Sequence, residues 1–132
     1  MKEKWIKSAP AILRLSVSFI FLWFGVNQLA NPQWFIGYLP LWSLKIVSAS
    51  TLLVINGLVE IVLGLLLLLG IAVRLSALLL SLHLLSITLS LGYNDVAVRD
   101  LGLTLATFSV FLAGDDRWCL GKRIFHKKNL VK

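Results

Sequence analysis

Four long apolar runs, separated by short polar or broken segments, dominate the pattern of the chain. They cover residues 9–30, 45–69, 72–91 and 96–114. As a helix, each is long enough to cross a hydrocarbon core of roughly 30 Å at about 1.5 Å per residue. The pattern therefore predicts an all-α fold, an integral membrane four-helix bundle that forms a single membrane domain over residues 1–132.

The segments between the runs predict how the helices connect. Residues 31–43 are broken by proline and glycine but rich in tryptophan and other aromatic residues, so we expect an interfacial loop along the membrane surface. A very short link at Arg74 makes the second and third helices antiparallel neighbours. Asn94 or Asp95 is the expected cap of the fourth helix.

The first run could be read as a secretory signal, but the sequence favours a spanning helix. Arg14 interrupts the apolar stretch, and no small-residue cleavage site follows it. Ser8 is the expected N-cap of this helix, with Pro10 in its first turn.

Composition and charge agree with a membrane protein. Hydrophobic residues make up 58% of the chain and charged residues only 14%, which is far more apolar than a soluble domain. The net charge of +7 comes from basic residues near the two ends, including the tail at 115–132. This distribution predicts cytoplasmic termini and contact with membrane lipids, and it argues against nucleic-acid binding.

Polar residues inside the apolar runs are the candidates for function. Glu60 falls near the centre of the second run, where an ionisable group is costly and usually faces the inside of a bundle. Asn56 lies four residues earlier on the same helical face, and Gly57 and Gly64 form a flat strip beside it where another helix can approach closely.

Sorted by depth, these residues predict two clusters. Arg14 is expected to extend towards Glu60, while Arg99 and Asp100 meet the end of the first helix under the aromatic loop. The candidate ligand-binding residues are Arg14, Asn56, Glu60 and His83 in the first cluster, and Asn27, Gln28, Arg99 and Asp100 in the second.

Each candidate also has a structural interpretation. The long stem of Arg14 allows it to reach the lipid headgroups, and His83 is compatible with simple packing. Glu60 is either held in a structural hydrogen bond, ionised against an arginine, or part of a binding cavity. Arg99 and Asp100 are adjacent and point about 100° apart, so we expect that they do not pair with each other and that at least one has a partner on another helix.

Several short motifs, in this order and spacing, resemble the DoxX family of small membrane proteins. They are the early Arg14, the end of the first helix at 24–29, the glycines and glutamate at 57–64, Leu69-Gly70 before Arg74, Arg99-Asp100, and Gly114 before Arg117-Trp118. The resemblance implies a four-helix bundle with Arg14, Glu60, Arg99 and Asp100 among its polar core positions. It also implies a multi-pass protein of the prokaryotic plasma membrane, associated with quinone-linked oxidoreductase complexes.

The polar residues are compatible with a quinone site. A quinone headgroup needs hydrogen-bond donors, a proton exchanger and an apolar slot, which the residues around Glu60 or around Asp100 can supply. The chain has no iron–sulfur, flavin or nicotinamide motif, no metal site is expected, and His126 lies away from His83, so a redox partner subunit would carry the electrons. The alternative is a non-enzymatic bundle that binds a lipid or stabilises a partner membrane protein. A transporter, which would require a homo-oligomer, is a third.

Overall fold

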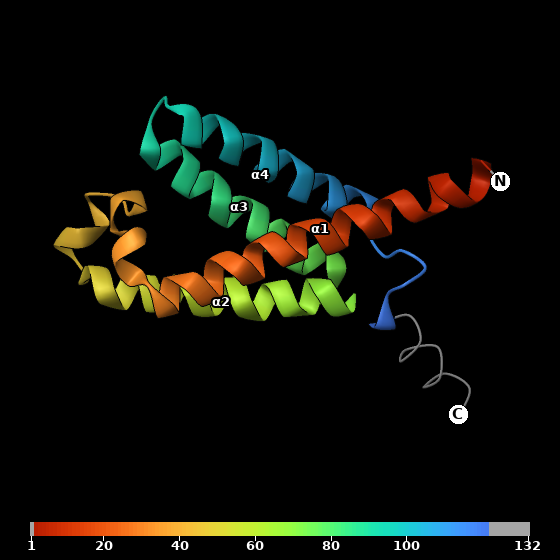
Figure 1. Ribbon diagram of the computed structural model, residues 1–132, viewed down its shortest axis with the longest axis horizontal. Coiled ribbons are helices and arrows are strands. Elements are labelled where there is room, and N and C mark those ends of the chain that lie inside the picture. Colours follow the sequence, from red (N-terminus) through yellow and green to blue (C-terminus); the bar gives the residue numbers. More distant parts are fainter. Residues whose placement is uncertain (1, 122–132) are drawn as a thin grey trace.

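The computed structural model describes residues 2–121 as four long α-helices and three short 3-10 turns (Figure 1). All four helices are long and apolar enough to cross a membrane, and no strand occurs in this range, so the predicted all-α four-helix membrane fold is confirmed. The helices are α1 (Lys2–Ala30), α2 (Ala49–Leu69), α3 (Val73–Leu91) and α4 (Asp95–Ala113), and the 3-10 turns are η1 (Pro32–Trp34), η2 (Ile36–Tyr38) and η3 (Ser43–Lys45).

The start of α1 differs from the prediction. The helix begins at Lys2 instead of being capped by Ser8, and Pro10 lies inside it. A proline this near the start removes one backbone hydrogen bond, and two features favour the preceding turns. Glu3 lies in the first turn, where the helix dipole favours an acid, and Lys7 bonds to it one turn later.

Helices α1 and α2 form one closely packed pair. A Cβ atom added to Gly57 would lie 2.9 Å from the carbonyl oxygen of Gly25, and one added to Gly25 would lie 2.8 Å from that of Gly57. A Cβ atom added to Gly64 would lie 3.2 Å from the side chain of Leu22. The glycine strip of α2 therefore does allow a second helix to approach closely, and that helix is α1.

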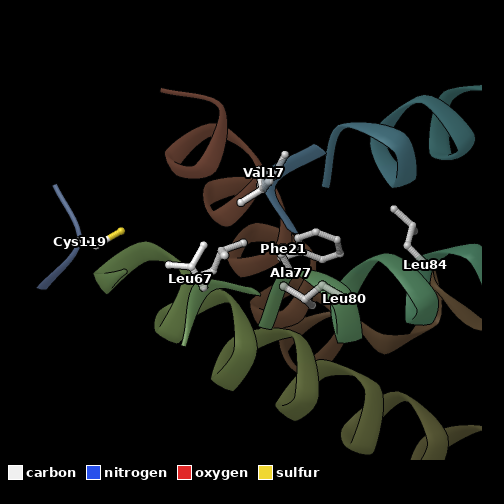
Figure 2. Packing of buried hydrophobic residues seen from close by; sticks show 9 residues of the cluster. Val17, Phe21, Leu67, Ala77, Leu80, Leu84 and Cys119 are labelled. Atoms are coloured by element: carbon white, nitrogen blue, oxygen red, sulfur yellow. The ribbon is translucent and has the colours of Figure 1, made fainter. Parts of the chain in front are cut away.

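Helices α3 and α4 form the second pair, and a shared apolar core joins the two pairs. Figure 2 shows this core, in which side chains from α1, α2 and α3 pack around Phe21. Val110 of α4 and Cys119 of the segment after α4 complete it. The buried side chains are Val17, Phe21, Leu67, Val73, Ala77, Leu80, Leu84, Val110 and Cys119.

The connections are specified by caps. Gly70 ends α2 with a φ of 69°, a left-handed conformation that favours glycine, and an added Cβ would collide with Cys119. Asn94 caps α4 by accepting a hydrogen bond from the Ala97 N–H at 2.9 Å, so of the two predicted caps Asn94 is the one used. The short link between α2 and α3 reverses the chain, as expected (Figure 1).

The two helix pairs are not parallel to one another. They lie together where α2 meets α3 and diverge towards the opposite end, where residues 31–48 lie (Figure 1). We call the end that holds the start of α1, the α2–α3 link and residues 114–121 the terminal end, and the opposite one the loop end. The charge pattern predicts that the terminal end is cytoplasmic. The basic residues of the tail from Lys122 onward, and His126, lie outside the described residues.

Candidate functional site

Arg14 lies at the terminal end, where one carboxylate and two backbone carbonyl groups bond to its guanidinium. Its side chain is 1% exposed, and its Nε donates to Oδ2 of Asp116 at 2.6 Å. One terminal nitrogen also donates to the carbonyl oxygens of Leu67 and Leu68, both at 2.6 Å, near the end of α2. The guanidinium thus ties α1 to the last turn of α2 and to the segment that follows α4.

Asp116 is held equally firmly. It accepts a hydrogen bond from the Trp118 backbone N–H at 2.8 Å, and its own N–H donates to the Cys119 sulfur at 3.3 Å. Burial alone would raise the pKa of the Asp116 carboxyl, but the hydrogen bonds from Arg14 and Trp118 and the positive charge of Arg14 outweigh it, so this pKa lies below its ordinary value. Burial raises the pKa of the neighbouring Cys119 thiol.

This arrangement corrects the expectation for Arg14. The side chain does not extend towards Glu60, nor does it reach out towards the headgroups, because Asp116 supplies a nearer carboxylate. Asp116 was not among the predicted site residues. A signal was present, since Gly114 ends the fourth helix at the same end as Arg14 and two acidic residues follow it directly.

Glu60 lies in the middle of α2, facing α1 and α3. Its Oε2 accepts a hydrogen bond from the Gln28 side-chain amide at 2.6 Å. Its Oε1 lies 3.4 Å from Nε2 of His83, and that nitrogen is buried without a hydrogen bond in residues 2–121. The structure therefore brings Glu60 together with Gln28 and His83, joining residues that had been assigned to separate clusters.

Asp100 is buried near the start of α4 and pairs with its neighbour. Nε of Arg99 donates to Oδ1 of Asp100 at 2.9 Å, which corrects the expectation that the two residues could not pair. Although their Cβ atoms point apart, the long arginine side chain can bend back along the helix surface. Its guanidinium also lies 5.9 Å from the ring centre of Phe24 on α1.

Glu60 and Asp100 line one pocket at the loop end. It lies where the two helix pairs diverge, and its cavity volume is about 50 Å³. This volume exceeds the roughly 10–15 Å³ that a cavity needs to hold one water molecule. The lining residues are Phe21, Phe24 and Gln28 of α1, Phe35, Tyr38 and Leu39 of the loop, Leu53, Asn56 and Glu60 of α2, Leu84 and Ile87 of α3, and Arg99, Asp100 and Leu103 of α4.

The loop segment closes this pocket from one side. Phe35 and Leu39 are buried and pack on Leu53 of α2, while Trp34 and Trp42 point outward and are largely exposed. The predicted aromatic loop thus has an inner, pocket-covering face besides the outer one. Five of the eight candidate residues line the pocket: Gln28, Asn56, Glu60, Arg99 and Asp100. His83 does not line it but contacts Glu60, which does. Asn27 and Arg14 lie outside the pocket.

The four spanning helices define the chain as a multi-pass membrane protein, and two carboxyl groups line a mostly apolar pocket between its helix pairs. The family model described as DoxX matches residues 9–92, which is more than half of the chain. The chain belongs to the DoxX family. The match covers α1 from residue 9 onward and all of α2 and α3, and it ends before α4, so Arg99 and Asp100 lie beyond it. Neither the curated proteins nor the solved structures include a significant match.

Proposed function

We propose that this chain is a membrane subunit of a quinone-linked oxidoreductase complex and that its loop-end pocket binds the quinone headgroup. One observation carries the proposal. Two carboxyl side chains from different helix pairs, Glu60 and Asp100, line the same mostly apolar pocket inside a membrane protein. Buried ionisable groups at such a depth usually mark a pathway or a binding site.

The surrounding residues have the chemistry that a quinone headgroup requires. The amide of Gln28 and the guanidinium of Arg99 are hydrogen-bond donors for its carbonyl oxygens, and Asn56 can donate or accept. The ring would lie among Phe24, Phe35 and neighbouring aliphatic side chains. Each electron that reduces a quinone to a quinol is accompanied by a proton, and Glu60 and Asp100 are the groups that can hold and release that proton.

We propose that another protein carries the redox centre that supplies the electrons. Within residues 2–121 no group of three or more His, Cys, Asp or Glu side chains is placed to hold a metal ion. In this proposal a partner subunit with its own redox centre delivers the electrons, and this chain holds the quinone beside it. The location that follows is the prokaryotic plasma membrane, where such complexes meet the quinone pool.

Mass spectrometry of the gently purified protein tests this function. The protein is isolated in a lipid-preserving detergent, and the bound small molecules are identified for wild type, Glu60→Gln and Asp100→Asn. Asp95→Asn and Glu3→Gln are matched controls, because these acids lie outside the pocket on the same or another helix. We expect wild type and both controls to retain a quinone and the two pocket variants to lose it.

Two other outcomes would contradict the quinone proposal and favour a non-enzymatic bundle. If wild type retains a phospholipid or another acyl lipid and no quinone, the pocket belongs to a non-enzymatic lipid-binding bundle. If no molecule is retained and the pocket variants only lose thermal stability, the carboxyl groups hold helices together and the quinone proposal is wrong.

A further inference from the structure

A second cavity adjoins the pocket on the outside of the bundle. It is a groove between α1 and α4, and its volume is about 420 Å³. It is formed by apolar side chains, one glycine and one arginine: Ile20, Phe24, Arg99, Gly102, Leu103 and Ala106. Figure 1 shows that α4 diverges from α1 towards its own beginning, which is the part of the helix that lines the groove.

The groove and the pocket share part of their lining. Phe24, Arg99 and Leu103 line both, so these three side chains form the boundary between them. Arg99 bonds to Asp100 on the pocket side, yet 55% of its side chain is exposed. The groove opens sideways from spanning helices, which places its mouth against lipid tails instead of water.

The two cavities differ in size and polarity in a way that suits the two parts of one amphiphile. The pocket holds both carboxyl groups but has a volume of only about 50 Å³, which leaves no room for a long tail. The groove has more than eight times that volume, and Arg99 is its one charged lining residue. A molecule with a polar ring in the pocket must direct its tail outward, and the adjoining groove is apolar.

We propose that the groove between α1 and α4 is the path by which the isoprenoid tail of the bound quinone passes from the pocket into the bilayer. Gly102 keeps this path open. A Cβ atom added to Gly102 meets no atom within 4 Å, so the glycine is not required for helix packing and the space above it is unfilled. This inference rests on the proposed quinone function and adds the route of the tail.

Gly102 permits a clean test, because larger residues there fill the groove without a collision in the fold. Replacing a helix glycine by alanine or leucine also favours the helix itself. Ser109→Leu is the matched control, since Ser109 is exposed on α4 about two turns further on and lines neither cavity. Binding is measured in nanodiscs by fluorescence quenching for wild type, Gly102→Ala, Gly102→Leu and Ser109→Leu.

The probes are a ubiquinone and a menaquinone with full isoprenoid tails, and the same rings with a methyl group in place of the tail. We expect Gly102→Leu to weaken binding of the tailed quinone by about tenfold or more, because the tail must then share an occupied space. The tailless ring should bind to Gly102→Leu as to wild type, within about twofold. Gly102→Ala should lie between, and Ser109→Leu should change neither affinity.

Three results would overturn the tail path, and they are distinguishable. Unchanged binding of the tailed quinone to Gly102→Leu means that the tail leaves elsewhere, while the quinone pocket stands. Loss of the tailless ring as well means that the groove is part of the headgroup site. If wild type binds none of the probes, the proposed function fails together with the tail path.

Discussion

The two ends of the bundle each contain buried acidic residues, but they differ in how many of their buried polar groups have a hydrogen-bond partner. At the terminal end, Arg14 and Asp116 bond to each other, and backbone groups of α2 and of Trp118 take up their remaining bonds. At the loop end, Glu60 has one amide partner, and the nitrogen of His83 beside it has none within the described residues.

The two sites also differ in whether a cavity lies beside them. The Arg14–Asp116 pair has side chains 1% and 2% exposed and lines neither of the two cavities described above. Glu60 and Asp100 face a cavity between diverging helices. A buried charge that is fully bonded and tightly packed fixes the arrangement of helices, whereas unmatched polar atoms beside open space can bond to a ligand. From this comparison we propose that the terminal end stabilises the bundle and that the loop end binds a ligand.

The largest expected effect is on stability, from Arg14→Leu. This change leaves the Asp116 carboxylate buried without its cation, and breaking one partner of a buried pair typically costs about 3–5 kcal/mol. Unfolding in mixed detergent micelles measures the loss. Arg117→Leu is the control, because Arg117 is exposed. A loss below about 1 kcal/mol for Arg14→Leu, the range of a surface ion pair, would contradict the structural role.

Asp116→Asn should change the pH dependence of stability. Because the pKa of Asp116 is lowered in the folded protein, its contribution is fully present above the ordinary value of about 3.9 and is lost as pH falls through the folded pKa. Wild type should therefore lose stability more steeply than Asp116→Asn in this acid range. Thermal unfolding from pH 7 downward measures the difference, and parallel curves would contradict it.

Next in size is the effect of the pocket carboxyls on binding. Glu60→Gln and Asp100→Asn each remove a carboxyl group that can bond to the headgroup, a loss worth about tenfold in quinone retention. Their effect on the free energy of unfolding should stay within about 1 kcal/mol, because neither replaces a fully bonded pair by an orphaned charge. Retention and unfolding are measured on the same preparations. A stability loss as large as that of Arg14→Leu would remove the distinction between the two ends.

The smallest expected effect is that of His83→Phe. The His83 Nε2 atom is buried without a hydrogen bond in the described part of the chain and lies 3.4 Å from Oε1 of Glu60, so an apolar ring of similar size removes only this one long contact. We expect a change in the free energy of unfolding below about 1 kcal/mol, measured as for Arg14→Leu. A larger loss would mean that His83 and Glu60 form a bonded pair in the folded protein.

The sequence predicted the fold because its signals are long and local. Four apolar runs of spanning length, the Asn94 cap and the glycines of α2 each act within one helix or at its end. The start of α1 was predicted wrongly because Ser8 and Pro10 form a good start signal, yet the earlier Glu3–Lys7 pair lets the helix begin sooner.

The polar contacts were harder to predict because they depend on how the helix pairs are inclined. Depth alone placed Arg14 below Glu60, and the two acidic residues after Gly114 did not by themselves show that the segment after α4 turns back to bring Asp116 to Arg14. The grouping of Glu60 with Asp100 follows from the divergence of the two pairs at the loop end. The pairing of Arg99 with Asp100 depends on the conformation of one long side chain, which sequence periodicity does not fix.

The most direct test measures stability and quinone retention together for one conservative variant at each end. Asp116→Asn and Glu60→Gln each replace a carboxylate by an amide of the same shape. The account predicts that Asp116→Asn lowers the unfolding temperature and keeps the bound quinone, while Glu60→Gln keeps the unfolding temperature and loses the quinone. If both variants change the two quantities in the same proportion, the two ends do not have separate roles and the account is wrong.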